Sequence, residues 1–305
     1  MADLPPHVVR TPEARFADLP EWPFAPKYLT VDTPSVGPLR VHVVDEGPRE
    51  ADETVLMLHG EPSWSYLYRR MIPPIVAAGH RAVAFDFPGF GRSDKPTEAG
   101  AYTYELHRTV LLDVIRQLDL QNVTLVVQDW GGLMGLPVAT LDVPDRIARL
   151  VVMNTFLPTG TETPTFGFRA WRASVRLLGR RLPIGRLMTM ALPDRQKPFV
   201  PAYTAPFPSV RYKAGAARWP LMVPMDPTDP VAEIMVRARE ALAIWDRPCL
   251  LVWSKADPIL GGAHRFFERL VPTAEPPTFV RGGHFLQDAS GAEIAEHVVA
   301  FVERT

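Results

Sequence analysis

Residues 123–132 read VTLVVQDWGG, and this stretch decides the fold. Residues 123–127 are apolar apart from Thr124, and a short β-branched run of this kind is typical of a fully buried strand in a parallel sheet. Asp129 follows the run almost at once, and two glycines come soon after it. A carboxylate that ends a buried strand and is followed by glycines indicates a sharp turn from strand into helix, with Asp129 presented at the turn.

The turn at Asp129 resembles the nucleophile elbow of α/β-hydrolases, in which the nucleophile sits between a strand and a helix. A carboxylate is poorly suited to acyl transfer, because its acyl-enzyme would be an anhydride. It suits attack on a saturated carbon that bears a leaving group, because the product is an alkyl ester that water can cleave. The sequence therefore predicts displacement at carbon followed by ester hydrolysis. The alternative interpretation is that Asp129 only caps the helix that follows it.

Strand and helix patterns alternate along most of the chain. Buried-strand patterns occur at residues 54–58, 81–85, 123–127, 150–153, 249–253 and 278–280, and helical patterns at 63–78, 104–118, 234–244 and 292–302. Residues 39–44 partly alternate, as in an antiparallel edge hairpin, and the proline-rich residues 1–36 are expected to form an extended arm over the surface. We predict an α/β-hydrolase fold, a mostly parallel sheet flanked by helices, whose reactive residues gather at the carboxyl ends of the strands.

The alternation stops between residues 156 and 230. This segment has many prolines, short basic amphipathic pieces such as RAWRASVRLLGRRL at 169–182, and no convincing strand. We interpret it as an inserted helical cap domain, with residues 1–155 and 231–305 forming the core domain. Because the total charge is balanced, the basic pieces are interpreted as solvated helix faces.

The composition of the 305 residues argues against several classes of function. The formal net charge of −1 leaves no basic excess for nucleic acid or an anionic membrane, so a small uncharged substrate fits better. Cys249 is the only cysteine and lies in an apolar run, where burial is expected rather than reactivity. The N-terminus lacks the apolar region of a signal peptide, and no apolar run reaches about 18 residues. We expect a soluble cytoplasmic protein that uses neither a cofactor nor a metal, and a monomer, although the sequence leaves the oligomeric state open.

Three candidate catalytic residues, Asp129, Asp257 and His284, each follow a predicted strand. Their order is the nucleophile, acid, histidine order of α/β-hydrolases. His284 is the predicted base, because the glycines before it let the loop bring the ring inward, and Asp257 is predicted to orient it and to stabilise the imidazolium. His59 is the rival histidine, but its place in HGEP fits the oxyanion loop, where we expect it to make a structural hydrogen bond. A carboxylate nucleophile is already ionised near neutral pH, so the histidine is needed only to activate water in the second step.

The oxyanion of that second step needs hydrogen-bond donors near Asp129. In α/β-hydrolases these donors are the backbone N–H of the residue after the nucleophile and one from the loop after an earlier strand. We predict that the backbone N–H groups of Trp130 and Glu61 fill this role.

Seven motifs make the resemblance to known proteins specific. They are HGEPSWSYLYRRM at 59–71, DFPGFGRSDKP at 86–96, VVQDWGG at 126–132, GFRAW at 167–171, YTAPFPS at 203–209, WSKADPI at 253–259 and GGHFLQD at 282–288. Together they resemble the haloalkane dehalogenases, and within them the subfamily that holds halide with two tryptophans. The similarity runs from about residue 36 to the C-terminus and includes the cap.

The resemblance implies a role for each candidate residue. Asp129 matches the nucleophile of that family, His284 the base and Asp257 the acid, while Trp130 and Trp171 match the two tryptophans that bind halide. The implied substrates are a small uncharged halogenated alkane and water, and the products are an alcohol, a halide ion and a proton. No cofactor or metal is implied.

The chain departs from other subfamilies at two positions. They have an Asn after the His-Gly pair and a Glu after the strand that here ends at Met153, whereas this chain has Glu61 and Asn154. Without the Asn amide, a second halide donor has to come from the cap. Trp171 is the predicted cap donor, and Trp219 is a possible pocket residue and the next candidate. An indole N–H can only donate, so two indoles stabilise the departing halide without giving up a proton.

The sequence leaves three rival functions open. An epoxide hydrolase also uses an elbow Asp, but it needs two cap tyrosines to protonate the alkoxide, and Tyr203 and Tyr212 are the only tyrosines in this cap. A fluoroacetate-type dehalogenase would need arginines to hold a carboxylate, and the charge of Glu61 would oppose an anionic substrate. A non-catalytic ligand-binding protein usually lacks a triad member, whereas this chain retains all three candidates.

Overall fold

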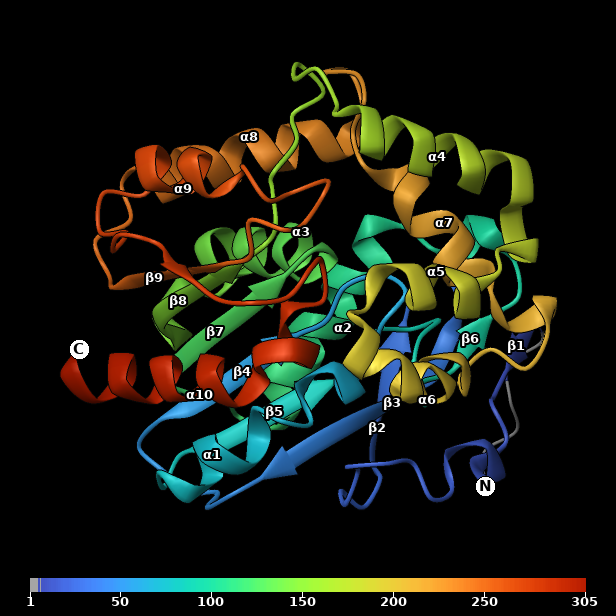
Figure 1. The fold of residues 1–305 in the computed structure, drawn as a ribbon, viewed down its shortest axis with the longest axis horizontal. Helices are drawn as coiled ribbons and strands as arrows, with labels where there is room; N and C mark the ends of the chain where they lie inside the picture. The colour runs from blue at the N-terminus through green and yellow to red at the C-terminus, as the bar shows by residue number, and fades with distance from the viewer. Residues whose placement is uncertain (1–4, 6) are drawn as a thin grey trace.

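The computed structural model, which describes Pro5 and residues 7–305, has an eight-stranded sheet at its centre (Figure 1). The strand order is β10-β9-β8-β7-β4-β5-β3-β2. The strands are β2 (Lys27–Thr33), β3 (Gly37–Glu46), β4 (Thr54–Leu58), β5 (Arg81–Phe85), β7 (Val123–Gln128), β8 (Ile147–Met153), β9 (Cys249–Trp253) and β10 (Thr278–Phe279). The β2–β3 and β3–β5 pairs are antiparallel and the other neighbours are parallel. The predicted mostly parallel sheet is confirmed.

Helices cover both faces of this sheet. On one side α1 (Ile72–Ala77) lies beside α10 (Leu286–Arg304), and on the other side lie α8 (Pro230–Ala243) and α9 (His264–Leu270) (Figure 1). Two further helices, α2 (Tyr104–Gln117) and α3 (Trp130–Pro137), flank β7 in the sequence. Because helices cover both faces, all residues of β4, β5 and β9 are buried, which explains their continuous apolar runs. No helix among the described residues has both the length and the apolar character needed to span a bilayer.

The segment between β8 and α8 is helical and contains no strand in the described structure. Its helices are α4 (Phe166–Leu178), α5 (Ile184–Ala191), α6 (Val200–Thr204) and α7 (Ala214–Met222). They gather at the end of the molecule where the parallel strands finish (Figure 1). The segment thus has the composition expected of the cap, and its limits at residues 156 and 230 stay a prediction.

Two sequence-based expectations about local structure are wrong in part. The helix expected at 63–78 is a 3-10 turn at Ser65–Tyr68 followed by the short helix α1. Pro73 and Pro74 explain the break, because proline lacks an N–H and is tolerated only in the first turn of a helix. The arm expected over residues 1–36 ends earlier, since residues 27–33 form the edge strand β2. Its residues 1–4 and 6 lie outside the described part of the chain.

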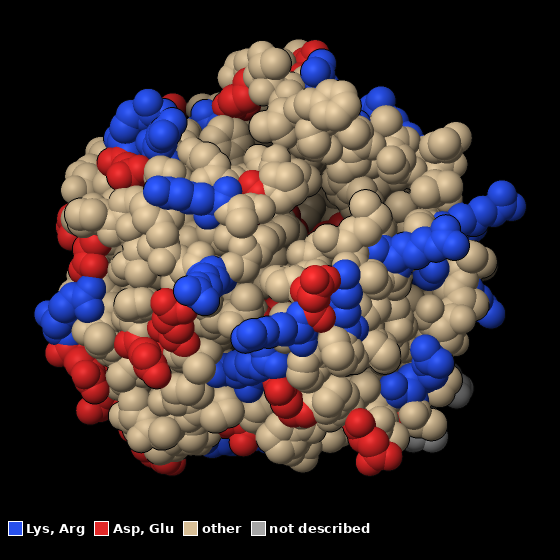
Figure 2. Space-filling model, viewed as in Figure 1, with Lys and Arg blue, Asp and Glu red and all other residues tan. Residues whose placement is uncertain are grey.

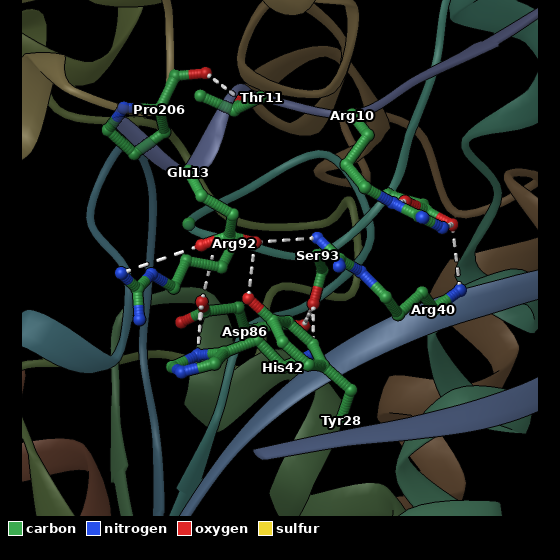
Figure 3. A network of polar contacts seen from close by, with 12 residues as sticks. Arg10, Thr11, Glu13, Tyr28, Arg40, His42, Asp86, Arg92, Ser93 and Pro206 are labelled. Atoms are coloured by element: carbon green, nitrogen blue, oxygen red, sulfur yellow. Dashed lines mark hydrogen bonds and ion pairs between the residues drawn. The ribbon is translucent and has the colours of Figure 1, made fainter. Parts of the chain in front are cut away.

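The buried carboxylate of Asp86 joins the loops that follow β4 and β5. Its oxygens accept hydrogen bonds from the backbone N–H groups of Ser65 and Arg92, each at 2.8 Å, and Oδ2 lies 2.8 Å from Nδ1 of His42 (Figure 3). Burial opposes the charge on Asp86, but His42 and the backbone donors outweigh it and hold the pKa of this carboxyl well below its usual range. The contact with Ser65 fixes the loop that begins at His59, which carries the oxyanion candidate Glu61.

The N-terminal segment is bound to the rest of the molecule by polar contacts (Figure 3). Glu13 accepts hydrogen bonds from the hydroxyl of Tyr28 at 2.6 Å and from Arg40 at 3.1 Å. Thr11 donates from its hydroxyl to the backbone oxygen of Pro206 at 2.8 Å. Residues before the sheet therefore contact both the edge hairpin and the segment that contains the cap helices.

Candidate active site

Asp129 occupies the turn between β7 and α3 with φ of 51°, a left-handed conformation that L residues rarely adopt. The glycines around it are required by close packing. A Cβ added to Gly131 would lie 2.0 Å from the backbone oxygen of Leu58 at the end of β4, and one added to Gly60 would lie 2.3 Å from Oδ1 of Asp129. The sharp turn predicted from VTLVVQDWGG is therefore present, and the Asp129 side chain stands at the carboxyl end of the central strands.

The structure brings His284 and both candidate aspartates together. Nδ1 of His284 lies 2.9 Å from Oδ2 of Asp257, and Nε2 lies 3.6 Å from Oδ2 of Asp129. The ring thus stands between the two carboxylates, with one nitrogen held and the other facing the candidate nucleophile. Its loop follows β10, and the loop of Asp257 follows β9.

Asp257 is a fully buried carboxylate with several donors. Asn154 donates from Nδ2 to Oδ2 at 2.9 Å, and the backbone N–H groups of Ile259 and Leu260 donate to Oδ1 at 2.8 and 3.0 Å. Burial would raise the pKa of Asp257, but the charge of His284 and these hydrogen bonds outweigh burial and lower it. Asp257 is therefore ionised, as the orienting role requires. The sequence showed Asn154 only as a departure from other subfamilies and gave no sign that it would hold Asp257.

His284 is a stronger base than an ordinary histidine. Burial lowers its pKa, but the charge and hydrogen bond of Asp257 and the charge of Asp129 outweigh burial and raise the pKa to about 9. Gln128 also supports the loop, because its Nε2 donates to the backbone oxygen of His284 at 3.1 Å. Gln128 is the last residue of β7, and no sequence pattern distinguished it from the rest of that strand.

The two carboxylate oxygens of Asp129 have different surroundings. Oδ1 accepts the backbone N–H of Glu61 at 2.8 Å, whereas Oδ2 faces His284. Burial raises the pKa of Asp129 above its ordinary value, and His284 and the backbone N–H groups of Glu61 and Trp130 pull it back only in part. The positive charge of the neighbouring imidazolium therefore favours the ionised form expected from the sequence.

The Glu61 side chain is buried, with 6% of its surface exposed, and its Oε1 has no hydrogen-bond partner among the described residues. Burial and the charge of Asp129 raise the pKa of this carboxyl well above its ordinary value. Burial therefore favours the protonated form of this carboxyl beside the candidate nucleophile Asp129. The expectation that its charge opposes an anionic substrate stays a prediction, and it requires the ionised form that burial disfavours.

A cavity of about 870 Å³ lies between the triad candidates and the cap helices. Figure 2 shows a hollow on this face whose rim carries few charged side chains. Trp130, at the start of α3, and Trp171, in α4, both line the cavity. No lysine or arginine of the described chain lines it. The wall is therefore mostly apolar and offers no cationic group for a substrate carboxylate.

The indole N–H groups of Trp130 and Trp171 have no protein acceptor in the described structure, whereas Trp219 has one. Trp219 is fully buried, does not line the cavity, and donates its N–H to Nε2 of His107 at 2.7 Å. The structure therefore brings Trp130 and Trp171 to the cavity and leaves Trp219 behind it. The suggestion that Trp219 lines the pocket is not supported.

The structural role expected for His59 is confirmed. Its Nε2 accepts the backbone N–H of Phe87 at 3.0 Å, and its Nδ1 lies 2.9 Å from the backbone oxygen of Gly60. Burial lowers the pKa of His59, so the ring is neutral and suited to accept that bond. No three His, Cys, Asp or Glu side chains in the described ranges are grouped so that they could hold a metal ion.

Comparison with known proteins identifies the family. The family model for the alpha/beta hydrolase fold matches residues 53–289. A haloalkane dehalogenase from Psychrobacter cryohalolentis is 44% identical over 298 residues, which are 97% of this chain and 98% of that protein. Haloalkane dehalogenase 1 from Mycobacterium tuberculosis is 46% identical over 301 residues, with coverage of 98% and 99%.

A solved structure agrees with these relatives. Haloalkane dehalogenase DpaA from Paraglaciecola agarilytica, which is described as tetrameric, has a TM-score of 0.90 and 39% identity, covering 96% of this chain and 98% of its own. The likeness therefore extends over nearly the whole of both chains. By its sequence and its fold, the chain belongs to the haloalkane dehalogenase family.

Proposed function

We propose that this chain hydrolyses the carbon–halogen bond of small uncharged haloalkanes, with Asp129 as the nucleophile. The observation that carries the proposal is that the two oxygens of the Asp129 carboxylate have different partners. Oδ1 accepts a hydrogen bond from a backbone N–H, and Oδ2 faces His284. Only Oδ2 is available to attack. The mostly apolar cavity supports an uncharged substrate.

In the first step Oδ2 of Asp129 attacks the carbon that bears the halogen. The new C–O bond forms as the carbon–halogen bond breaks, and the halide leaves with the bonding electron pair. The indole N–H groups of Trp130 and Trp171 receive the ion, because both side chains line the cavity and neither N–H donates to an acceptor among the described residues. Halide is a weak base, so no general acid is needed.

In the second step His284 takes a proton from water, and the resulting hydroxide adds to Cγ of the Asp129 ester. The negative charge then develops on Oδ1, where the backbone N–H groups of Glu61 and Trp130 stabilise it. Collapse of this intermediate breaks the ester bond and releases the alcohol, which takes up one proton. The other proton passes to solvent, so the sum of the two steps is alcohol, halide and a proton.

The raised pKa of His284 fits this order of events. In the free enzyme the charge of Asp129 contributes to the pKa of about 9, so the ring is protonated at neutral pH and its charge favours the ionised carboxylate without being required for the attack. Esterification removes the charge on Asp129. The pKa of His284 then falls, and the ring becomes able to accept a proton when the second step requires a base.

Epoxide hydrolysis is less well supported. Opening an epoxide leaves an alkoxide that must be protonated, and neither cap tyrosine lines the cavity. Tyr203 is fully buried and donates its hydroxyl to Asp288, so it is committed elsewhere. A panel of terminal chloro-, bromo- and iodoalkanes, with an epoxide run beside them, should give halide release without diol formation. Diol formation without halide release would favour the epoxide hydrolase.

Labelling with oxygen-18 water tests the nucleophile directly. Hydroxide adds to Cγ of Asp129 in each cycle, so solvent oxygen should appear in the Asp129 carboxylate after many turnovers. Peptide mass analysis would locate it, with Asp257 as the internal control that stays unlabelled. If residue 129 stays unlabelled while halide is released, water attacks the substrate directly and the covalent mechanism is wrong.

The monomer expected from the sequence also remains a proposal. The relative DpaA is described as tetrameric, which makes a tetramer the alternative. Light scattering on the purified protein distinguishes the two states.

A further inference from the structure

The side chain of Trp219 packs against the back of the halide-binding candidate Trp130. Trp219 belongs to α7 and is fully buried. Its ring centroid lies 5.0 Å from that of Trp130, and the two planes meet at 33°. Four other rings lie around it: Phe90 at 4.3 Å, His107 at 4.9 Å, Phe87 at 5.5 Å, and His59 at 6.0 Å in a nearly parallel stack of 17°. Trp219 therefore fills the space into which the Trp130 indole would otherwise tilt.

A single hydrogen bond fixes the orientation of Trp219. Its indole N–H donates to Nε2 of His107 at 2.7 Å, and both side chains are fully buried. Because an indole N–H is only a donor, Nε2 has to accept and the ring proton has to reside on Nδ1. Burial and the nearby His59 lower the pKa of His107 to about 3, so the ring stays neutral and able to accept at any working pH.

The strength of the proposed hydrogen bond from Trp130 to the halide depends on where the indole N–H points. A hydrogen bond weakens steeply when the donor points away from the acceptor, and the halide appears at a place fixed by the line of attack from Asp129. Trp130 directly follows Asp129 in the chain, so its backbone is set by the elbow. The elbow does not set the plane of its ring, which depends on what packs behind it.

We propose that Trp219 and His107 form a positioning pair that holds the Trp130 indole in the plane from which it donates to the departing halide. The inference rests on the proposed function. His107 in α2 and Trp219 in α7 would then affect the alkylation step, although neither side chain lines the cavity. It also explains why an indole with no access to the substrate stands so close to the halide site.

Three variants separate this role from simple packing. His107→Leu removes the acceptor, His107→Gln keeps one at about the same distance from the backbone, and Trp219→Phe keeps an aromatic ring but removes the N–H. The readouts are the dissociation constant of bromide by calorimetry and the rate of alkylation in a single turnover. Trp64→Phe is the matched control, because Trp64 is also fully buried and donates its N–H to a backbone oxygen, that of Ala202 at 3.1 Å.

We expect His107→Leu and Trp219→Phe each to weaken bromide binding by about three- to tenfold, the range expected for one misaligned hydrogen bond. Alkylation should slow in parallel, and His107→Gln should recover most of both losses. The double variant should be no worse than the single ones, because all act through one hydrogen bond. Trp64→Phe should leave bromide binding unchanged even if it lowers the melting temperature.

Bromide binding in folded His107→Leu that equals that of the unaltered protein would overturn the inference, as would fully additive losses in the double variant. If His107→Leu does not fold, Trp219→Phe and His107→Gln decide by the same criteria. Failure of the proposed function gives a different result, because the unaltered protein itself would then neither bind bromide nor release halide.

Discussion

Nε2 of His284 lies 3.6 Å from Oδ2 of Asp129, while Nδ1 of the same ring is held 2.9 Å from Asp257. At this distance His284 makes no close hydrogen bond to Asp129, yet it faces the oxygen that the proposed mechanism turns into the ester oxygen. In that mechanism Asp129 carries out the first step and His284 the second.

His284→Gln should still be alkylated but should not release the product, because no base remains to activate water. Intact-mass measurement after exposure to a bromoalkane should show the protein heavier by one alkyl group, and halide release should stop after one equivalent. Asp129→Asn is the control and should gain no mass. Steady turnover by the Gln variant would mean that another group is the base.

Trp171→Phe tests the halide role of the cap. The Phe ring keeps most of the apolar wall of the cavity but removes the N–H, and loss of one preorganised donor of this kind costs about a hundredfold or more in rate. Chloroalkanes should suffer more than iodoalkanes, because chloride is the poorer leaving group and depends more on the donor. Rates of halide release for matched substrates provide the measurement. Equal losses for the two halogens would point to a packing role for Trp171.

The triad candidates could be predicted because local sequence specifies them. Each lies in the turn or loop that follows a strand, and parallel strands carry their carboxyl ends to one edge of the sheet, so Asp129, Asp257 and His284 were expected to converge. The break in the helix before α1 could also be predicted, because Pro73 and Pro74 disfavour a continuous helix there.

The properties that the sequence left open are ones that only tertiary packing decides. Whether Trp219 faces the cavity depends on His107, which lies 112 residues away in the sequence. The charge of Glu61 depends on how completely the folded protein removes it from water, and a sequence motif carries no measure of that burial. The same holds for Asn154, whose contact with Asp257 joins the ends of two neighbouring strands, β8 and β9.

Glu61→Gln should change the pH dependence of stability. The folded pKa of Glu61 is raised, so the folded protein holds a proton there that the unfolded chain loses above its ordinary value of 4.5. The contribution of Glu61 to the free energy of unfolding is fully present below that pH and is lost as the pH rises toward the folded pKa. Gln imitates the protonated acid and does not titrate, so the free energy of unfolding of the variant should exceed that of the unaltered protein by a margin that grows with pH.

Urea denaturation at about pH 5, 6.5 and 8 measures this difference in the free energy of unfolding. Glu50→Gln, which alters an exposed carboxyl, is the control and should give a constant difference. A constant difference for Glu61→Gln as well would show that Glu61 is ionised in the folded protein.

Asn154→Ala should weaken the support of Asp257. The folded pKa of Asp257 is depressed, so its stabilising contribution is present above the ordinary value of 3.8 and is lost as the pH falls through the folded pKa. Without the 2.9 Å hydrogen bond from Nδ2 the folded pKa of Asp257 rises, so acid unfolding of the variant should begin at a higher pH.

Asn154 also adopts φ of 21°, so Ala adds backbone strain, but strain does not depend on pH and lowers stability equally throughout. Circular dichroism during acid titration separates the two effects, with Asn122→Ala, at another residue of positive φ, as the matched control. A uniform loss of stability in both variants would show that Asn154 acts only through its backbone, and that the ionisation of Asp257 depends on His284 and the backbone N–H groups alone.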